Sequence, residues 1–275
     1  MEVIHAIILG IVQGLSEFLP ISSSGHLIIV PKIMDWHYNG KAFDVALHIG
    51  TFFALIIFYR REFISLAGAF FKSIFQFSFK DDYNRKLVWM LLASAIPGAL
   101  VGVAFNKIIE KDFSDLRIIA ALLIIFAVVL WLADRRVGKI QREGEFNWWD
   151  AVSMGAAQAI ALFPGVSRSG ITMTAGLLRG FSRKDTANYS FLISLPIIGG
   201  AALYEGFSLF HKQGGIGHGM AVPFMAGIMA SFISGIIAIK YLLKYVSTKN
   251  FNVFIIYRLI AGALVLVWTF YHPVS

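Results

Sequence analysis

The sequence predicts an all-α integral membrane protein with six transmembrane helices and two re-entrant helical hairpins, arranged as two inverted-topology repeats. The first observation is composition: 57% of the 275 residues are hydrophobic and only 15% are charged, against about 25% charged residues in soluble domains. The second is a set of six apolar stretches long enough to cross a bilayer. The third is a pair of shorter apolar regions, each interrupted by polar residues. This composition excludes a soluble enzyme and a disordered chain, and the absence of cysteine excludes a disulfide scaffold and thiolate chemistry.

The six predicted transmembrane helices share apolar runs near the length of about 17–25 residues that a span requires. They are residues 43–59, 87–105, 116–133, 186–210, 220–243 and 251–271.

Two further regions, 3–30 and 151–178, are apolar at both ends and polar in the middle. Glu17 and Pro20 interrupt the first, and Arg168 lies in the interruption of the second. Irregular backbone at membrane depth is tolerated where it is buried in protein or lines a wet cavity. Each region is therefore predicted to be a re-entrant hairpin whose tip faces an internal site.

The two hairpin regions also resemble each other in sequence. A shift of 145 residues aligns six identical residues within sixteen positions, beginning with Gly10 on Gly155 and ending with Gly25 on Gly170. We therefore expect one membrane domain, 1–275, with a first repeat over about 1–133 and a second over about 146–275. Three spans per repeat make the second copy inverted, so that the two tips meet near the midplane, as in inverted-repeat transporters.

Loop charges set the expected orientation. If the six spans alternate across the membrane, sixteen Lys and Arg residues fall on one side and six on the other. The side with sixteen is predicted to be cytoplasmic, which places both termini outside. The first hairpin then enters from outside and the second from the cytoplasm. The formal charge of +8 is thereby explained without a nucleic-acid partner.

Segment 62–79 has apolar residues at helical spacing and is predicted to be an interfacial amphipathic helix.

The first tip carries chemistry-bearing side chains. Gln13 and Glu17 are four residues apart on one helix face, and three serines and an imidazole follow within ten residues: Ser22, Ser23, Ser24 and His26. Ionisable groups at membrane depth are costly, and they usually mark function. The alternative is that the serines pack helices and Glu17 pairs with a cation.

The second tip carries an anion-binding pattern. Arg168 lies between Ser167 and Ser169, and Thr172 follows. A guanidinium suits phosphate, and backbone N–H groups at the start of the returning helix add further donors. The alternative is a structural ion pair between Arg168 and Glu17. Both interpretations hold together if the pair opens when substrate arrives.

The two tips together contain an acid, an imidazole, hydroxyls and an arginine, which is a constellation for phosphoryl transfer. A site within a lipid-accessible scaffold favours a lipid phosphate as substrate. Glu17 and Gln13 are candidate oxygen ligands for Mg²⁺ or Ca²⁺, with substrate phosphate oxygens completing the shell.

Both motifs resemble the signatures of the bacterial undecaprenyl-pyrophosphate phosphatase family. The first runs Gln13-Gly-Leu-Ser-Glu17 and continues as Pro20-Ile-Ser-Ser-Ser-Gly-His26, and the second runs Pro164-Gly-Val-Ser-Arg-Ser-Gly-Ile-Thr172. The resemblance covers the whole chain in length, span number and motif placement. It implies hydrolysis of undecaprenyl pyrophosphate to undecaprenyl phosphate and inorganic phosphate, which recycles the lipid carrier for cell-wall synthesis. It also implies dependence on a divalent metal, an active site open to the outer face of the bacterial inner membrane, and bacitracin resistance.

The resemblance also implies residue roles. Glu17 matches the second acid of the family motif, a metal ligand or base, and Gln13 occupies a position that is Glu in many members. Ser23 matches the proposed nucleophile, and His26 matches a general acid or base or an alternative nucleophile. Arg168 matches the phosphate-binding arginine, and its motif hydroxyls are Ser167, Ser169 and Thr172. Ser22 and Ser24 are further predicted substrate contacts. His26 lies one helical turn from Ser23 and is a candidate to take its proton; attack by metal-bound water is equally compatible.

The remaining ionisable residues rank lower. Asp44 and His48 are four residues apart and could share one helix face of a site. A local pair, or a pair of residues at the end of a span, explains them at least as well. Arg258 lies within the last span and is expected to reach toward the cytoplasmic interface.

The rival function is a lipid-phosphate transporter with the same inverted repeats, and a non-catalytic scaffold ranks last. The expected partners are the polyprenyl pyrophosphate substrate and membrane lipid, with no nucleic acid, and a homodimer is left open.

Overall fold

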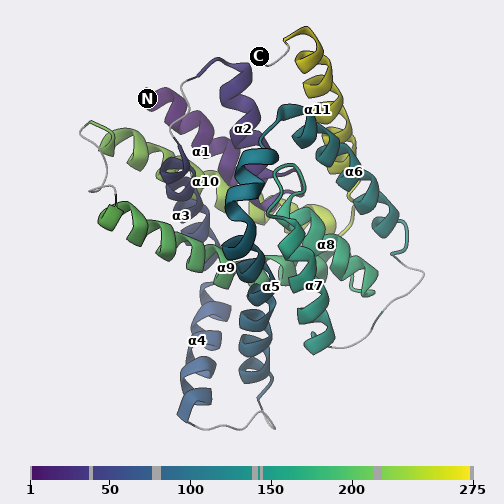
Figure 1. The fold of residues 1–275 in the computed structure, drawn as a ribbon. Helices are drawn as coiled ribbons and strands as arrows, with labels where there is room; N and C mark the ends of the chain where they lie inside the picture. Colours follow the sequence, from purple (N-terminus) through teal and green to yellow (C-terminus); the bar gives the residue numbers. More distant parts are fainter. Residues whose placement is uncertain are drawn as a thin grey trace.

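The computed structural model is helical throughout the residues it describes, 2–36, 40–75, 82–137, 142, 145–212 and 219–272 (Figure 1). These ranges contain eleven helices and no strand. The helices are α1 Val3–Phe18, α2 Ser23–Ile33, α3 Lys41–Phe58, α4 Arg60–Phe75, α5 Tyr83–Asp112, α6 Leu116–Asp134, α7 Trp148–Ile160, α8 Arg168–Leu178, α9 Arg183–Lys212, α10 Ala221–Val246 and α11 Asn252–Tyr271. The all-helical prediction is confirmed.

Five segments of the described chain are long and apolar enough to cross a membrane, and they correspond to five of the six predicted spans. They are Tyr83–Phe105, Leu116–Asp134, Arg183–Tyr204, Ala221–Val246 and Asn252–Tyr271. The sixth predicted span forms α3, which qualifies only together with α4, and the two are bent by 89° at their junction. The protein is therefore a multi-pass membrane protein with five or six candidate spans.

Helix α4 covers most of the segment predicted to be an amphipathic helix. It packs along α5, burying Leu66, Ala69 and Ser73, and Trp89 of α5 donates its indole N–H to the Ser73 hydroxyl at 3.0 Å. Residues 76–79 of the predicted segment lie outside the described residues. Its place at the membrane interface stays a prediction.

Both predicted hairpins contain two short helices with an irregular connection. The chain leaves α1 at Phe18 and enters α2 at Ser23, and it leaves α7 at Ile160 and enters α8 at Arg168. Each returning helix has 11 residues, too few to cross a bilayer at 1.5 Å per residue.

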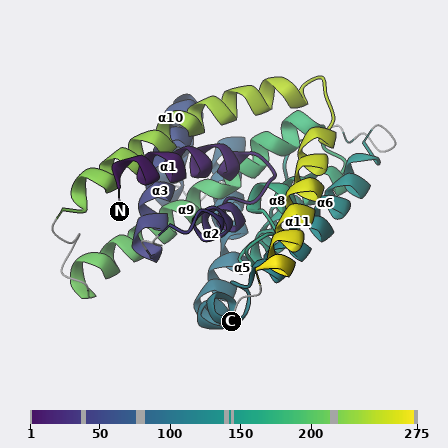
Figure 2. The ribbon, with the colours of Figure 1, turned by 90° about the horizontal axis from the view of Figure 1, so that it is seen from above.

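The short helices of one half pack on a long helix of the other half. Helix α1 lies beside α10, and α6 and α11 pack against each other (Figure 2). Helix α7 packs against α5. Small residues allow these close approaches. A Cβ atom on Gly155 of α7 would lie 2.6 Å from the Ser94 carbonyl oxygen of α5, and a Cβ on Gly10 of α1 would overlap the Gly227 carbonyl of α10.

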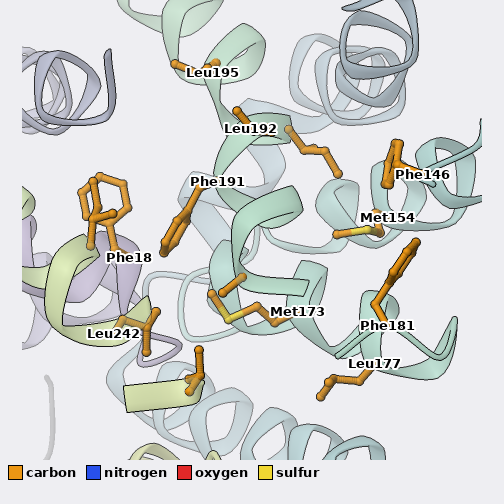
Figure 3. Packing of buried hydrophobic residues seen from close by; sticks show 14 of the residues in the cluster. Phe18, Phe146, Met154, Met173, Leu177, Phe181, Phe191, Leu192, Leu195 and Leu242 are labelled. Carbon is orange, nitrogen blue, oxygen red and sulfur yellow. The ribbon is translucent and has the colours of Figure 1, made fainter. Parts of the chain in front are cut away.

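The largest apolar cluster joins the end of α1 to side chains of α7, α8 and α9, among other helices (Figure 3). Phe18, at the end of α1, meets Phe191 of α9 edge to face with ring centroids 5.3 Å apart. Both side chains are fully buried. Because Phe18 follows Glu17 directly, this aromatic pair helps to fix the end of α1 where the polar tip begins.

Candidate active site

The carboxylate of Glu17 is the centre of the candidate site. Glu17 is the next-to-last residue of α1, with only 5% of its surface exposed, and both carboxylate oxygens have partners. Oε1 pairs with Nη2 of Arg168 at 2.7 Å. Oε2 accepts from the Ser23 hydroxyl at 2.6 Å and from Nε2 of Gln13 at 3.0 Å, and Nε2 of His48 lies 3.5 Å away. The structure thus brings Gln13, Glu17, Ser23 and Arg168 together, as the two motifs predict.

The returning helices of the two tips begin in the same unusual way. Ser22 and Ser167 precede α2 and α8 with φ angles of 77° and 75°, a conformation that L-residues with a side chain rarely adopt. Each hydroxyl accepts a hydrogen bond from the backbone N–H three residues on, at Gly25 or Gly170. Left-handed backbone in non-glycine residues costs about 1–3 kcal/mol and is found preferentially at functional sites.

The two tips are bonded directly to each other. The Ser22 hydroxyl accepts from the Gly165 N–H at 3.1 Å, and the Ser169 hydroxyl donates to the Leu19 carbonyl at 2.9 Å. The ion pair between Glu17 and Arg168 adds a third link. Residues about 150 positions apart therefore form one continuous polar site.

Arg258 lies beneath both tips, which corrects the expectation that it reaches toward the cytoplasmic interface. Its side chain is fully buried, and it donates to four main-chain carbonyl oxygens. These belong to Pro20 in the first tip, to Gly165 and Val166 in the second, and to Leu123 in α6, at 2.9–3.3 Å. Arg258 does not extend to the interface because its hydrogen-bond acceptors lie inside the protein. These carbonyl groups of the two tips make no helical hydrogen bonds and therefore need another donor.

His26 lies beside Ser23 in α2 but is bonded elsewhere. Its Nδ1 is 2.7 Å from the Ser22 carbonyl oxygen, and its Nε2 is 2.7 Å from the Tyr257 hydroxyl of α11. A carbonyl only accepts, so Nδ1 carries a proton and Nε2 accepts from Tyr257 in the neutral ring. The acceptor that meets the Ser23 hydroxyl is Glu17 rather than His26. A catalytic role for His26 stays a prediction.

The other predicted substrate contacts differ in how their hydroxyls are used. Ser167 caps α8, and Thr172 bonds Ser190 of α9 at 2.6 Å. Together with Ser22 and Ser169, these hydroxyls are buried and bonded within the protein, whereas Ser23 and Ser24 are partly exposed. Contact of these hydroxyls with substrate stays a prediction.

Two residues reach the site from outside both motifs, and the sequence does not predict their place in it. His48 comes from α3, outside both motifs, and Tyr257 comes from α11. The sequence places Asp44 and His48 at helical spacing, and Nδ1 of His48 lies 2.7 Å from the Asp44 carbonyl oxygen. No local pattern points from either residue to the tip that it reaches.

The charges of the site favour an anion. Glu17 is neutralised by Arg168, and the guanidinium of Arg258 bonds only carbonyl oxygens within the described chain. The described site therefore carries an excess positive charge in a buried setting, where electrostatic attraction is strong.

Fold and site together define a multi-pass helical membrane protein with a buried acid, hydroxyl and guanidinium cluster between two broken helical segments. The chain belongs to the bacitracin resistance protein BacA family, whose model matches residues 6–264. The resemblance stated from the two motifs is thereby confirmed.

Curated relatives match nearly the whole chain. An undecaprenyl-diphosphatase of Pelobacter propionicus is 44% identical over 266 residues, covering 96% of each chain. One of Trichlorobacter lovleyi is 43% identical over 263 residues, covering 95% of each. One of Saccharophagus degradans is 38% identical over 270 residues, covering 98% of this chain and 99% of its own.

Proposed function

We propose that this chain is an undecaprenyl-diphosphatase, a hydrolase that converts undecaprenyl pyrophosphate to undecaprenyl phosphate and inorganic phosphate. The observation that carries the proposal is the contact of Ser23 and Arg168 with the same buried carboxylate, Glu17. This places a hydroxyl nucleophile, a proton acceptor and a phosphate-binding cation within one site. The full-length similarity to relatives that bear this name supports the same function.

The reaction begins with substrate binding at Arg168. The pyrophosphate displaces Glu17 as the partner of the guanidinium, whose planar fork suits phosphate oxygens. The buried charge of Arg258 and the first turn of α8 favour the same anion. The ion pair of the free protein is thus a resting arrangement that opens when substrate arrives.

Ser23 then attacks the terminal phosphorus while Glu17 accepts the hydroxyl proton. The new bond joins Ser23 Oγ to phosphorus, and the bond between that phosphorus and the bridging oxygen breaks, with undecaprenyl phosphate leaving. Water subsequently cleaves the phosphoserine and releases inorganic phosphate. The hydrogen bond of 2.6 Å from Ser23 to Glu17 supports this choice over His26, whose Nε2 faces Tyr257.

A divalent cation, Mg²⁺ or Ca²⁺ by the chemistry of oxygen ligands, is proposed to assist. The described residues hold no group of three or more His, Cys, Asp or Glu suited to a metal. The buried Oε1 of Gln13, however, has no hydrogen-bond partner, and it lies next to Glu17. Gln13 and Glu17 thus fit a partial oxygen shell that substrate phosphate oxygens complete. When bound, the cation neutralises charge on the pyrophosphate.

The chain is further proposed to consist of two inverted repeats, about 1–133 and 146–275, each starting with a re-entrant hairpin. Ser22 and Ser167, 145 positions apart, share backbone conformation and capping role. The packing is reciprocal, since α1 contacts α10 and α7 contacts α5. These relationships support the repeat. The excess of Lys and Arg on one side of the six spans, sixteen against six, supports the placement of both termini outside.

The proposed location is the bacterial inner membrane, with the site open to the outer face and activity conferring bacitracin resistance. Because the chain contains no cysteine, single-cysteine variants test the orientation. In intact spheroplasts, an impermeant maleimide is expected to label Asp35→Cys, and to label Lys184→Cys only after permeabilisation. The reverse pattern contradicts the orientation. A homodimer remains a proposal that cross-linking in membranes tests.

Phosphate release from undecaprenyl pyrophosphate by the purified chain in detergent tests the function. Release that stops with EDTA and returns with added cation is the expected result. A folded protein that releases no phosphate, and that moves lipid phosphate across liposome membranes, would point to the transporter alternative.

A further inference from the structure

Tyr257 of α11 reaches the first tip from outside both motifs. Its hydroxyl oxygen lies 2.7 Å from Nε2 of His26, and the two rings are nearly parallel, with an interplanar angle of 18°. His26 is buried, whereas Tyr257 is 43% exposed. The contact is therefore a polar one, between a buried imidazole and the hydroxyl of a surface tyrosine, and packing of an apolar core does not explain it.

The hydrogen bonds of His26 run in one direction, toward the Ser22 carbonyl. A carbonyl oxygen only accepts, so Nδ1, at 2.7 Å from it, carries the ring proton. In the neutral ring Nε2 is then an acceptor, and Tyr257 donates to it. Both ring nitrogens are thus engaged, and no lone pair of the imidazole remains to accept a proton from Ser23.

The Ser22 carbonyl belongs to the same peptide unit as the N–H of Ser23. That carbonyl accepts two hydrogen bonds from His26, one from Nδ1 at 2.7 Å and one from the backbone N–H at 3.2 Å. A peptide unit is planar, so this one cannot rotate without losing both bonds. Its orientation helps to set the direction of the Ser23 side chain, whose hydroxyl meets Glu17 at 2.6 Å.

The second tip shows that this backbone conformation forms without an imidazole. Ser167 is left-handed like Ser22, with φ angles of 75° and 77°. Its carbonyl accepts the backbone N–H of Ile171 at 2.9 Å, as the Ser22 carbonyl accepts that of His26. Ile171 stands 145 positions after His26 and has no ring nitrogen to donate. The imidazole therefore adds a restraint only in the tip that carries Ser23.

We propose that Tyr257 is a positioning residue for the attack by Ser23, acting through His26 on the peptide unit between Ser22 and Ser23. This rests on the proposed phosphatase function and deepens it, because His26 then orients the nucleophile instead of transferring its proton. The hydroxyl of Tyr257 keeps the ring in the tautomer whose Nδ1–H faces the carbonyl. Without that hydroxyl Nε2 can take the proton, and Nδ1 then faces the carbonyl oxygen as a second acceptor.

Steady-state phosphate release by the full chain in detergent tests this role. Tyr257→Phe is expected to lower kcat by about 10–10²-fold, the effect of misplacing a reacting group by up to about 1 Å. KM should stay the same, because the substrate binds at Arg168. Tyr271→Phe, at the exposed end of the same helix, is the matched control and should behave as the wild type does. A Tyr257→Phe enzyme with the kcat of the wild type would overturn the proposal.

Two substitutions of His26 separate orientation from proton transfer. His26→Asn places an amide nitrogen near the position of Nδ1 and keeps a donor for the Ser22 carbonyl, whereas the amide of His26→Gln lies near the position of Nε2. His26→Asn is therefore expected to be the more active variant, and Tyr257→Phe should cost nothing further in the His26→Asn background. Equal losses of about 10²–10⁴-fold in both His26 variants, as for a lost general acid or base, would overturn the proposal.

Nitrogen NMR of the chain labelled with ¹⁵N-histidine reads the hydrogen bonds of His26 without turnover. The His26 signals, identified by their absence in His26→Asn, are expected to show a protonated Nδ1 and an unprotonated, hydrogen-bonded Nε2. Tyr257→Phe should change them, and unchanged signals would overturn the proposal. A wild type that shows these signals but releases no phosphate overturns the phosphatase function and leaves the hydrogen bonds standing. A wild type that releases phosphate no faster than Tyr257→Phe overturns the positioning role alone.

Discussion

Glu17 and Arg168 lie 151 positions apart in the chain, yet their side chains form an ion pair at 2.7 Å. Neither charge has another carboxylate or guanidinium partner among the described residues. Buried pairs of this kind are weak evidence for stability, because desolvation offsets much of the attraction. The pair is better explained by the chemistry it prepares, with Arg168 ready for an anion and Glu17 ready for the Ser23 proton.

Arg168→Ala and Arg168→Lys test the phosphate-binding role. Loss of the guanidinium should lower the rate of phosphate release by about 10²–10³-fold, the range for removing one charge-stabilising donor. Lysine keeps the charge but loses the fork, so its rate should lie between the two. Steady-state release from undecaprenyl pyrophosphate measures the effect, with Arg117→Ala at the exposed start of α6 as control. An Arg168→Ala rate equal to that of the wild type removes Arg168 from the mechanism.

Ser23 is predicted to carry the phosphoryl group during turnover. Quenching of the working enzyme in denaturant at neutral pH, which preserves both phosphoserine and phosphohistidine, followed by peptide mass spectrometry should find phosphate on Ser23, because the proposed intermediate is a phosphoserine. Ser23→Ala should show no phosphopeptide and only residual release. A phosphate found on His26, or a fully active Ser23→Ala, would instead assign the attack to the imidazole or to water.

Arg258→Met is predicted to destabilise the protein by several kcal/mol. The substitution removes the arginine donor from three buried tip carbonyls, those of Pro20, Gly165 and Val166, each at a cost of about 1–3 kcal/mol, and it disconnects both tips from α11. Thermal unfolding in detergent measures the change, with Arg117→Met as control. Equal melting temperatures for Arg258→Met and the wild type would show that the tips hold together without this residue.

Gly155→Ala is predicted to separate α7 from α5 and to destabilise the fold by about 1–3 kcal/mol, the usual cost of overpacking. The added methyl group would lie 2.6 Å from a backbone carbonyl, which has little freedom to move. Gly68→Ala is the matched control on α4, where an added Cβ meets nothing within 4 Å and removal of a helical glycine should stabilise slightly. Denaturant unfolding of both variants measures the difference, and equal stabilities contradict the prediction.

The sequence predicts much of this architecture because hydrophobic length and motif chemistry are local signals. Five spans follow from apolar runs, and the polar interruptions at Glu17 and Arg168 predict where the two tips lie. For Arg168 the sequence allows two interpretations, a phosphate-binding group and a structural partner of Glu17. A resting ion pair that opens when substrate arrives is compatible with both.

The parts that the sequence does not reveal depend on partners without a local signature. Arg258 bonds main-chain carbonyls, which every residue has, so its position within a span gives no indication of the tips. His48 meets Glu17 through a separate helix, and only the packing of α3 against α1 brings them together. The 89° bend between α3 and α4 occurs without proline or glycine at Tyr59, the junction residue.

The most direct test of the central claim compares phosphate release by the wild type and by Glu17→Gln. The substitution keeps the shape of the side chain, but it removes the proton acceptor of Ser23 and the charge that Arg168 pairs with. The account predicts that release from undecaprenyl pyrophosphate falls by about 10²–10⁴-fold while the variant remains folded in detergent. Release at the wild-type rate by a folded Glu17→Gln would contradict the account.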